Sequence, residues 1–273
     1  MNRLSLYHPK HVLSGIFLAV PAWAVDPPVA RAADSAEEAG LEIATQARER
    51  QKGFGNFTAN LTMVLRNKKG RESRRELRLK VIEVEGNGDR TLFVFDRPRD
   101  VKGTAFLVHA HKNEPDEQWL YLPGLKRVKR ISSSKQSGSF MGSEFSYEDM
   151  GATEVEKYTH RFLRNEPCGD LECTVSERIP VDRDSGYTRQ LVWRDREELR
   201  TMKVQFFDRG EAHLKTMVVE DYEKYLDRYW RGGKLTMTNH LTGKSTVLLW
   251  SDYEFGTDLD LDDFTRTALK RVR

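Results

Sequence analysis

The feature that most constrains the fold is a hydrophobic period of two that begins at Phe57. Apolar residues alternate with polar ones as far as Leu65, which is the pattern of a β-strand with one buried face. Further runs of this kind follow, separated by short turn sequences, so we expect an antiparallel meander of about 10 or 11 strands in a single sheet. The second run changes phase at Ile82, which predicts a bulge there.

Helices are few in this pattern. Ser35 is a suitable cap for an amphipathic helix that Gly53 ends, and Asp263 opens a short helix that runs through Leu269. One or two further turns are expected between residues 147 and 156. A sheet of this width must curl, and two or three helices are too few to fill its concave face. The sequence therefore predicts a mostly β protein of the α+β class with a cavity.

The stretch 118–150 interrupts the meander. The strand at residues 119–122 is followed by a turn at Pro123 and then by a short strand that carries four cations. This strand is either a solvated edge protected by charge against aggregation or a docking patch for anionic headgroups or an acidic partner protein. The cations are Lys126, Arg127, Lys129 and Arg130.

Residues 132–146 are mostly serine and glycine, so their backbone freedom is high. Phe140, Met141 and Phe145 nevertheless occur within this segment, where a solvated loop would carry polar groups. Two interpretations remain open. The segment is either a mobile gate over an apolar, negatively charged ligand or a surface loop that packs three side chains onto the core.

The N-terminus has the form of an export signal. Basic residues precede an apolar run at residues 12–20, and Ala22-Trp23-Ala24 matches the small-x-small cleavage pattern. We therefore expect a signal peptide at residues 1–24, a flexible linker at 25–34 and one domain at 35–273, with a later cleavage near Ala32 or a frayed N-terminal helix as alternatives. No other apolar run approaches about 20 residues, so a periplasmic, soluble mature protein is expected.

Two cysteines, Cys168 and Cys173, flank a short turn. In an oxidising compartment such a pair can form a disulfide across a hairpin, and its spacing does not match a C-x-x-C redox motif. We expect a structural disulfide.

Other chemistry has weak support in the sequence. His109 and His111 lie on one strand face but lack further ligands at suitable spacing, and the aspartates at residues 258–263 lack the calcium-loop pattern. No nucleophile elbow or phosphate-binding glycine motif occurs. Lys and Arg total 45 against 42 Asp and Glu, which disfavours nucleic acid as a partner. We expect no enzymatic activity, no cofactor and no metal.

Several blocks resemble the outer-membrane lipoprotein-sorting protein family, periplasmic relatives of the lipoprotein carriers LolA and LolB. The blocks are 92–95 with Pro98, 101–104, 118–123, 126–131, 140–149 and the ending 263–269 with Thr246. The resemblance implies a half-open antiparallel barrel with helices as a lid over an apolar cavity. It also implies carriage of acyl chains, as lipid or lipoprotein, sometimes beside an RND-type exporter of the inner membrane.

We therefore hypothesise a periplasmic carrier that binds acyl chains and contacts membranes transiently, with the four cations as the docking patch and the three apolar residues of the 132–146 segment as the gate. An alternative is a periplasmic sensor of lipid or protein, like RseB-type regulators, and a third is a hydrolase of envelope polymers. The candidate cavity residues are Phe57, Leu61, Leu65, Phe93, Phe106, Trp119 and Tyr121.

Overall fold

The computed structural model describes Met1 and residues 28–272, with side chains from Asp34 onward. Apart from Met1, the predicted signal peptide lies outside these residues. In the described part of the chain, no helix is long and apolar enough to span a membrane.

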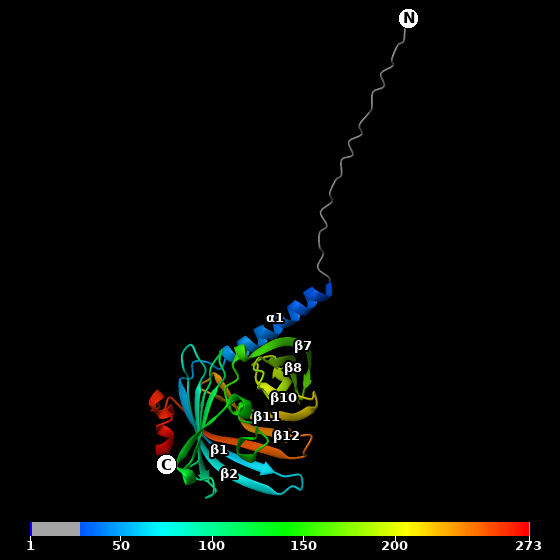
Figure 1. Ribbon diagram of the computed structural model, residues 1–273. Helices are drawn as coiled ribbons and strands as arrows, with labels where there is room; N and C mark the ends of the chain where they lie inside the picture. The colour runs from blue at the N-terminus through cyan, green and yellow to red at the C-terminus, as the bar shows by residue number, and fades with distance from the viewer. Residues whose placement is uncertain (2–27, 273) are drawn as a thin grey trace.

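One antiparallel sheet of 13 strands makes up most of the chain (Figure 1). Strands β1 to β6 lie side by side in sequence order, and β7 to β13 do the same, with β13 paired to β1. The ends β6 and β7 do not pair, so the sheet curves without closing. The strands are β1 (Asn56–Arg66), β2 (Glu72–Ile82), β3 (Arg90–Arg97), β4 (Ala105–His109), β5 (Glu117–Leu122), β6 (Arg127–Ile131), β7 (Tyr158–Cys168), β8 (Leu171–Pro180), β9 (Tyr187–Asp195), β10 (Thr201–Asp208), β11 (His213–Tyr225), β12 (Tyr229–Asn239) and β13 (Ser245–Phe255).

The single antiparallel sheet agrees with the sequence prediction, but the strand number is higher than expected. Short strands such as β4 and β6, of five residues each, are included among the 13. The predicted bulge at Ile82 is wrong, because this residue pairs in register with Asn56 and Arg90 on its two neighbours. The irregularity between β2 and β3 lies instead at Glu76 and Leu77.

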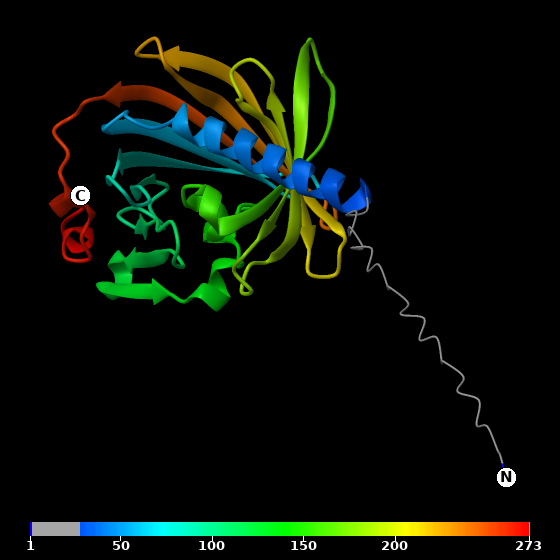
Figure 2. The same cartoon turned by 90° about the horizontal axis from the view of Figure 1, so that it is seen from above.

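Helix α1 (Pro28–Glu49) crosses the open, concave side of the sheet and packs against β7 (Figure 2). It begins seven residues before Ser35, so Ser35 is not its cap and residues 28–34 of the predicted linker are helical. Proline is favoured at the first helical position, and the alanines after it are strong helix formers, which accounts for the earlier start. Gly40 lies directly on the backbone of Arg161 in β7, since an added Cβ would come within 2.6 Å of it.

The other helical elements are short, so the described residues contain one substantial helix where two or three were expected. The predicted C-terminal helix is replaced by two 3₁₀ turns, the first capped by Asp260. These short elements are η1 (Pro123–Leu125), α2 (Ser133–Gln136), η2 (Phe140–Gly142), η3 (Glu148–Met150), η4 (Val155–Lys157), η5 (Leu261–Phe264) and η6 (Ala268–Arg271).

Both faces of the sheet bury apolar side chains. The largest cluster lies on the concave side and combines residues of β1–β6 and β9–β13 with Phe140, Phe145 and Met150 from the segment between β6 and β7. A second cluster lies on the opposite face, where the turns η5 and η6 place Phe264 and Leu269 on β3, β4 and β5. The C-terminal turns therefore cover the convex face of the first half of the sheet.

Candidate functional site

The predicted cavity residues are divided between the two faces of the sheet. Five of them, Phe57, Leu61, Leu65, Phe93 and Phe106, belong to the concave cluster. Trp119 and Tyr121 pack instead against the C-terminal turns on the convex face, so their assignment to a concave cavity is wrong. Period-two alternation cannot identify the concave side of a strand such as β5, which has large apolar residues on both faces.

The concave surface next to these five residues is occupied by the segment between β6 and β7. Phe140 is fully buried, and its ring lies 5.1 Å from that of Phe106 and 6.0 Å from that of Phe93, measured between centroids. Phe145 is also buried, whereas Met141 is half-buried. The protein's own side chains thus fill the space that the sequence assigns to a ligand in this half of the sheet.

A buried ion pair fastens this segment to the second half of the sheet. The Nζ of Lys215 on β11 donates to Asp149 at 2.7 Å and to the backbone carbonyl of Glu144 at 3.0 Å. The hydroxyl of Tyr187 on β9 donates to the same Asp149 carboxylate at 2.9 Å. The sequence analysis missed this ion pair, although one signal was present. Lys215 is in phase with Met217 and Val219, which face the concave side of the sheet, so its side chain also points inward.

Glu148 holds the same segment to the turn between β8 and β9. Its carboxylate accepts hydrogen bonds from the Ser185 hydroxyl at 2.9 Å and from the backbone N–H of Gly186 at 3.0 Å. Burial, together with the nearby charge of Asp149, raises the pKa of Glu148 to about 7.

A groove remains open in the second half of the sheet. It lies between α1 and the concave face of β7–β13 and has a volume of about 450 Å³. None of the seven predicted cavity residues lines it. Its apolar wall, which comes from β10, β11, β12 and β13, consists of Val204, Met217, Val219, Leu235, Trp250 and Tyr253.

The other wall of the groove is polar and basic. Five arginines line the groove against one carboxylate, that of Glu154. Arg48 of α1 donates to Glu154 at 2.8 Å and to Asp89 at 3.3 Å, which ties the C-terminal end of the helix to two connecting segments of the sheet. The remaining arginines are Arg178 on β8, Arg194 on β9, Arg200 and Arg231.

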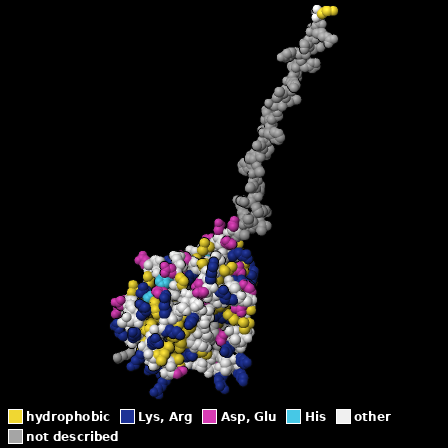
Figure 3. Space-filling model, viewed as in Figure 1, with side chains coloured by type: hydrophobic (Ala, Val, Ile, Leu, Met, Phe, Trp, Pro, Cys, Tyr) yellow, Lys and Arg dark blue, Asp and Glu magenta, His cyan; other side chains and the backbone are white. Residues whose placement is uncertain are grey.

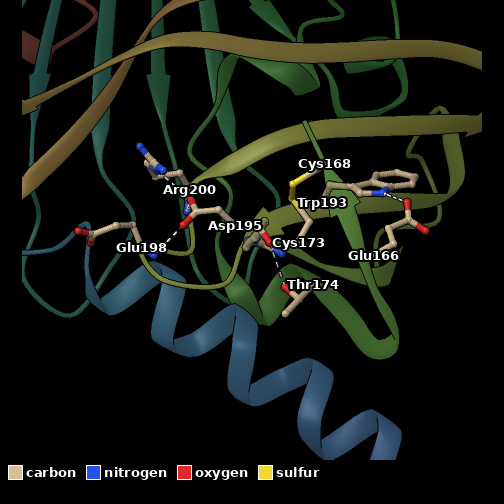
Figure 4. The surroundings of a disulfide bond; sticks show 9 residues. Glu166, Cys168, Cys173, Thr174, Trp193, Asp195, Glu198 and Arg200 are labelled. Atoms are coloured by element: carbon tan, nitrogen blue, oxygen red, sulfur yellow. Dashed lines mark hydrogen bonds and ion pairs between the residues drawn. A yellow bond between two sulfur atoms is a disulfide. The ribbon is translucent and has the colours of Figure 1, made fainter. Parts of the chain in front are cut away.

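The predicted disulfide is present between Cys168 and Cys173 and joins β7 to β8 beside Trp193 (Figure 4). On the next strand, Asp195 accepts hydrogen bonds from the guanidinium of Arg200 at 2.9 Å and from the backbone N–H of Glu198 at 2.7 Å. These contacts order the connection from β9 to β10, which forms one end of the groove.

The predicted basic patch consists of three residues on β6, an edge strand of the sheet, and of Lys126, which directly precedes that strand. Its four side chains are exposed, and only Arg130 is paired among the ion pairs of residues 34–272, with Glu117 at 3.2 Å. On the face seen in Figure 3, basic and acidic side chains are interspersed. The patch is therefore a local feature of the β6 edge, remote in the sheet order from the groove strands.

The two histidines considered as a metal pair have separate partners. The Nε2 of His109 bonds to the carbonyl of Phe264 at 2.6 Å, and the Nδ1 of His111 lies 3.2 Å from the amide of Asn87. Over the described residues, no three His, Cys, Asp or Glu side chains are grouped closely enough to hold a metal ion.

Comparison with known proteins relates the chain to proteins of this architecture. A family model described as "uncharacterized protein" matches residues 87–271. The structure of a domain described as an outer-membrane lipoprotein-sorting protein from Vibrio parahaemolyticus is 51% identical, with a TM-score of 0.85 over 86% of this chain and 100% of that one. No protein of curated function matches the chain.

Two further solved structures share the fold. A DUF1329 family protein from Desulfovibrio piger is 27% identical, with a TM-score of 0.81 over 86% of this chain and 99% of that one. A LolA superfamily protein from Nitrosomonas europaea is 22% identical, with a TM-score of 0.68 over 84% and 98% of the two chains, and shows the fold alone. The chain therefore belongs to the outer-membrane lipoprotein-sorting protein family and has the open curved-sheet fold of the LolA superfamily.

Proposed function

We propose that this protein carries an acyl chain of a lipid or lipoprotein through the periplasm and holds that chain in the groove beneath α1. The observation that supports the proposal is an open groove of about 450 Å³ with one continuous apolar wall. This volume lies within the range of roughly 300–1,000 Å³ that is typical of sites for small ligands. The part of the concave face predicted from sequence offers no comparable space, because Phe140 and its neighbours fill it.

The apolar wall provides enough binding energy for a reversible carrier. Burial of one methylene contributes about 0.8 kcal/mol, so eight methylenes along the wall contribute roughly 6 kcal/mol before the cost of association is subtracted. This interaction needs no covalent step, and we assign no catalytic residue. Noncovalent binding of this strength also allows the acyl chain to be exchanged with a donor and an acceptor membrane rather than retained permanently.

The remaining elements fit this role. The relative from Vibrio parahaemolyticus is described as a lipoprotein-sorting protein, which supports acyl chains as the cargo and the periplasm as the compartment. The exposed cations of β6 offer a surface for transient contact with anionic headgroups or with an exporter of the inner membrane.

Two variants of α1 test the position of the cargo. Ala47 lines the groove, whereas Thr45 is exposed on the same helix. Ala47→Phe fills part of the groove and is expected to weaken binding of a dansyl-labelled fatty alcohol by about tenfold, the equivalent of roughly two methylenes. Thr45→Phe, the matched control, should leave binding unchanged.

Three outcomes decide the proposal. If both helix variants weaken binding of the probe equally, or if neither weakens it, the groove is not the binding site. Organic extraction of the purified protein followed by mass spectrometry should yield acyl-bearing molecules, and a vesicle-to-vesicle assay should show their transfer. Binding without transfer would favour a sensor over a carrier.

A further inference from the structure

The polar floor of the groove is made by three adjacent strands. His160 on β7 is opposite Arg178 on β8, and Arg178 is opposite Gln190 on β9. Arg194 pairs with Thr174 four residues along the same ladder, with Ser176 between them on the same face. These side chains are all buried, whereas the concave faces of β10–β13 are mainly apolar. The groove thus has a polar end and an apolar end.

Two arginines of this floor lack the acidic partner that such burial normally requires. Arg178 is 9% exposed and Arg194 is 8% exposed. Among the ion pairs of residues 34–272, neither guanidinium has a carboxylate within 4.0 Å. The Nε of Arg178 donates to the side-chain oxygen of Gln190 at 2.7 Å, and Nη1 of Arg194 reaches the Ser176 hydroxyl at 3.4 Å.

Most of their donors remain available to the groove. A guanidinium has five N–H donors, and the printed bonds use one on each side chain. Among the described residues, two buried side-chain atoms lack a hydrogen-bond partner, and they belong to Gln118 and Trp230. The nitrogen atoms of Arg178 and Arg194 are not among them. Both residues line the groove, and the guanidinium of Arg178 also lies over the ring of Tyr158, with Cζ 4.6 Å from the ring centroid. The indole Nε1 of Trp230, a third groove residue, is buried without a partner.

This arrangement is costly in the absence of an anion. Burial, and next the charge of Arg178, lower the pKa of Arg194 to about 9. The pKa of His160 is lowered by burial and by the charges of both arginines, which favours the neutral imidazole over a third positive charge. Two other arginines of the groove show the usual solution, because Arg48 pairs with Glu154 and Arg200 with Asp195. Arg231 also has no carboxylate among the ion pairs of residues 34–272, but its guanidinium donates to the side chain of Gln51 and to the carbonyl of Trp230. Two buried cations on one face of the same pair of strands are costly without a counter-ion, and an anionic ligand in the groove would supply the missing charge.

We propose that Arg178 and Arg194 bind the anionic headgroup, a carboxylate or a phosphate, of an amphiphile whose acyl chain lies along β10–β13. This inference rests on the proposed acyl-binding function and adds a substrate class, since it selects acidic lipids over neutral ones. Guanidinium groups suit this task because they bind carboxylate and phosphate oxygens through paired N–H donors. The head is held by β8 and β9, and the tail follows the apolar wall.

The experiment compares two probes that differ only in the head: a dansyl-labelled fatty acid and the dansyl-labelled alcohol of the same chain length. The wild-type protein is expected to bind the acid at least about tenfold more tightly, since hydrogen bonds to a charged group are stronger than those to a neutral one. Arg194→Gln should abolish this preference by reducing the affinity for the acid to that for the alcohol. Arg178→Gln, the second variant, should do the same if the first fails to fold.

The matched control is Arg196→Gln, because Arg196 is an exposed arginine two residues from Arg194. This control should retain the full preference for the acid. Lysophosphatidic acid and monoacylglycerol, used as competitors, compare a phosphate head with a neutral head, and lysophosphatidic acid is expected to displace the acid probe more strongly. Inorganic phosphate alone should not displace the acid probe.

Each result has one meaning. If both probes bind the wild-type protein equally, or if the arginine variants keep the preference, the headgroup proposal is wrong while the acyl-binding function stands. If neither probe binds, the proposed function itself is wrong. If inorganic phosphate displaces the acid as well as lysophosphatidic acid does, the arginines bind a free anion and the lipid assignment is overturned.

Discussion

Phe140 provides the sharpest test of how the concave face is used. If the segment between β6 and β7 is part of the core, Phe140→Ala removes a fully buried ring that contacts four others, those of Phe93, Phe95, Phe106 and Tyr147, at centroid distances of 5.1–6.0 Å. Deletion of a buried phenylalanine typically costs about 3–5 kcal/mol. The surrounding rings come from the sheet as well as from the segment, so the cavity has little room to collapse and the upper part of this range is expected.

The assay is urea unfolding followed by circular dichroism, with Leu125→Ala as the control because Leu125 is 69% exposed. The control should change the free energy of unfolding by less than about 0.5 kcal/mol. Below its unfolding transition, Phe140→Ala should still bind the fatty alcohol probe, because Phe140 does not line the groove. A loss of stability below about 1 kcal/mol, combined with altered lipid transfer, would refute this reasoning and support the gate predicted from sequence.

Three further predictions concern the contacts around this segment and the disulfide. Lys215→Met leaves the buried carboxylate of Asp149 without its cation and should lower the free energy of unfolding by about 3–5 kcal/mol; a urea midpoint equal to that of the wild type would contradict it. Because folding raises the pKa of Glu148 from 4.5 to about 7, the folded state retains a proton that the unfolded chain releases, and stability should fall by up to about 3 kcal/mol as the pH rises through this interval. Urea titrations at several pH values should show that Glu148→Gln removes this slope, and an unchanged slope would assign it to other groups. Replacement of Cys168 and Cys173 by serine opens a loop with a sequence separation of five and should cost about 2 kcal/mol on the chain-entropy model; a double variant as stable as the oxidised protein would show that the disulfide does not restrain the unfolded chain.

The strand arrangement was predictable because it depends on local alternation and turn residues, and both are readable over stretches such as Phe57–Leu65. The width was underestimated, because 13 strands form where about 10 or 11 were expected, and the openness was implied by the family resemblance rather than by this pattern. The direction in which each strand face points was harder to predict from the sequence. On β8 and β9, the apolar residues Val175 and Trp193 form a small cluster on the convex side, so an alternation that appears to place arginines in solvent in fact places them in the groove.

The occupied half of the concave face was not predictable for a related reason. Whether Phe140 fills a hollow or covers it depends on the path of a serine- and glycine-rich segment, which has no periodicity of its own. That path is determined by long-range contacts, above all the pair of Lys215 with Asp149. The disulfide, in contrast, needs only a hairpin between Cys168 and Cys173, and the sequence contains its turn.

The contact of Gly40 with the backbone of Arg161 has a consequence for the capacity of the groove. Helix α1 forms the roof, and at Gly40 it rests on β7 with no side chain between the two backbones. The height of the roof is therefore set by the absence of one carbon atom at a residue that does not itself line the groove. A relative with a larger residue at this position would have to carry its helix further from the strand, and so would accommodate a bulkier cargo with the same walls.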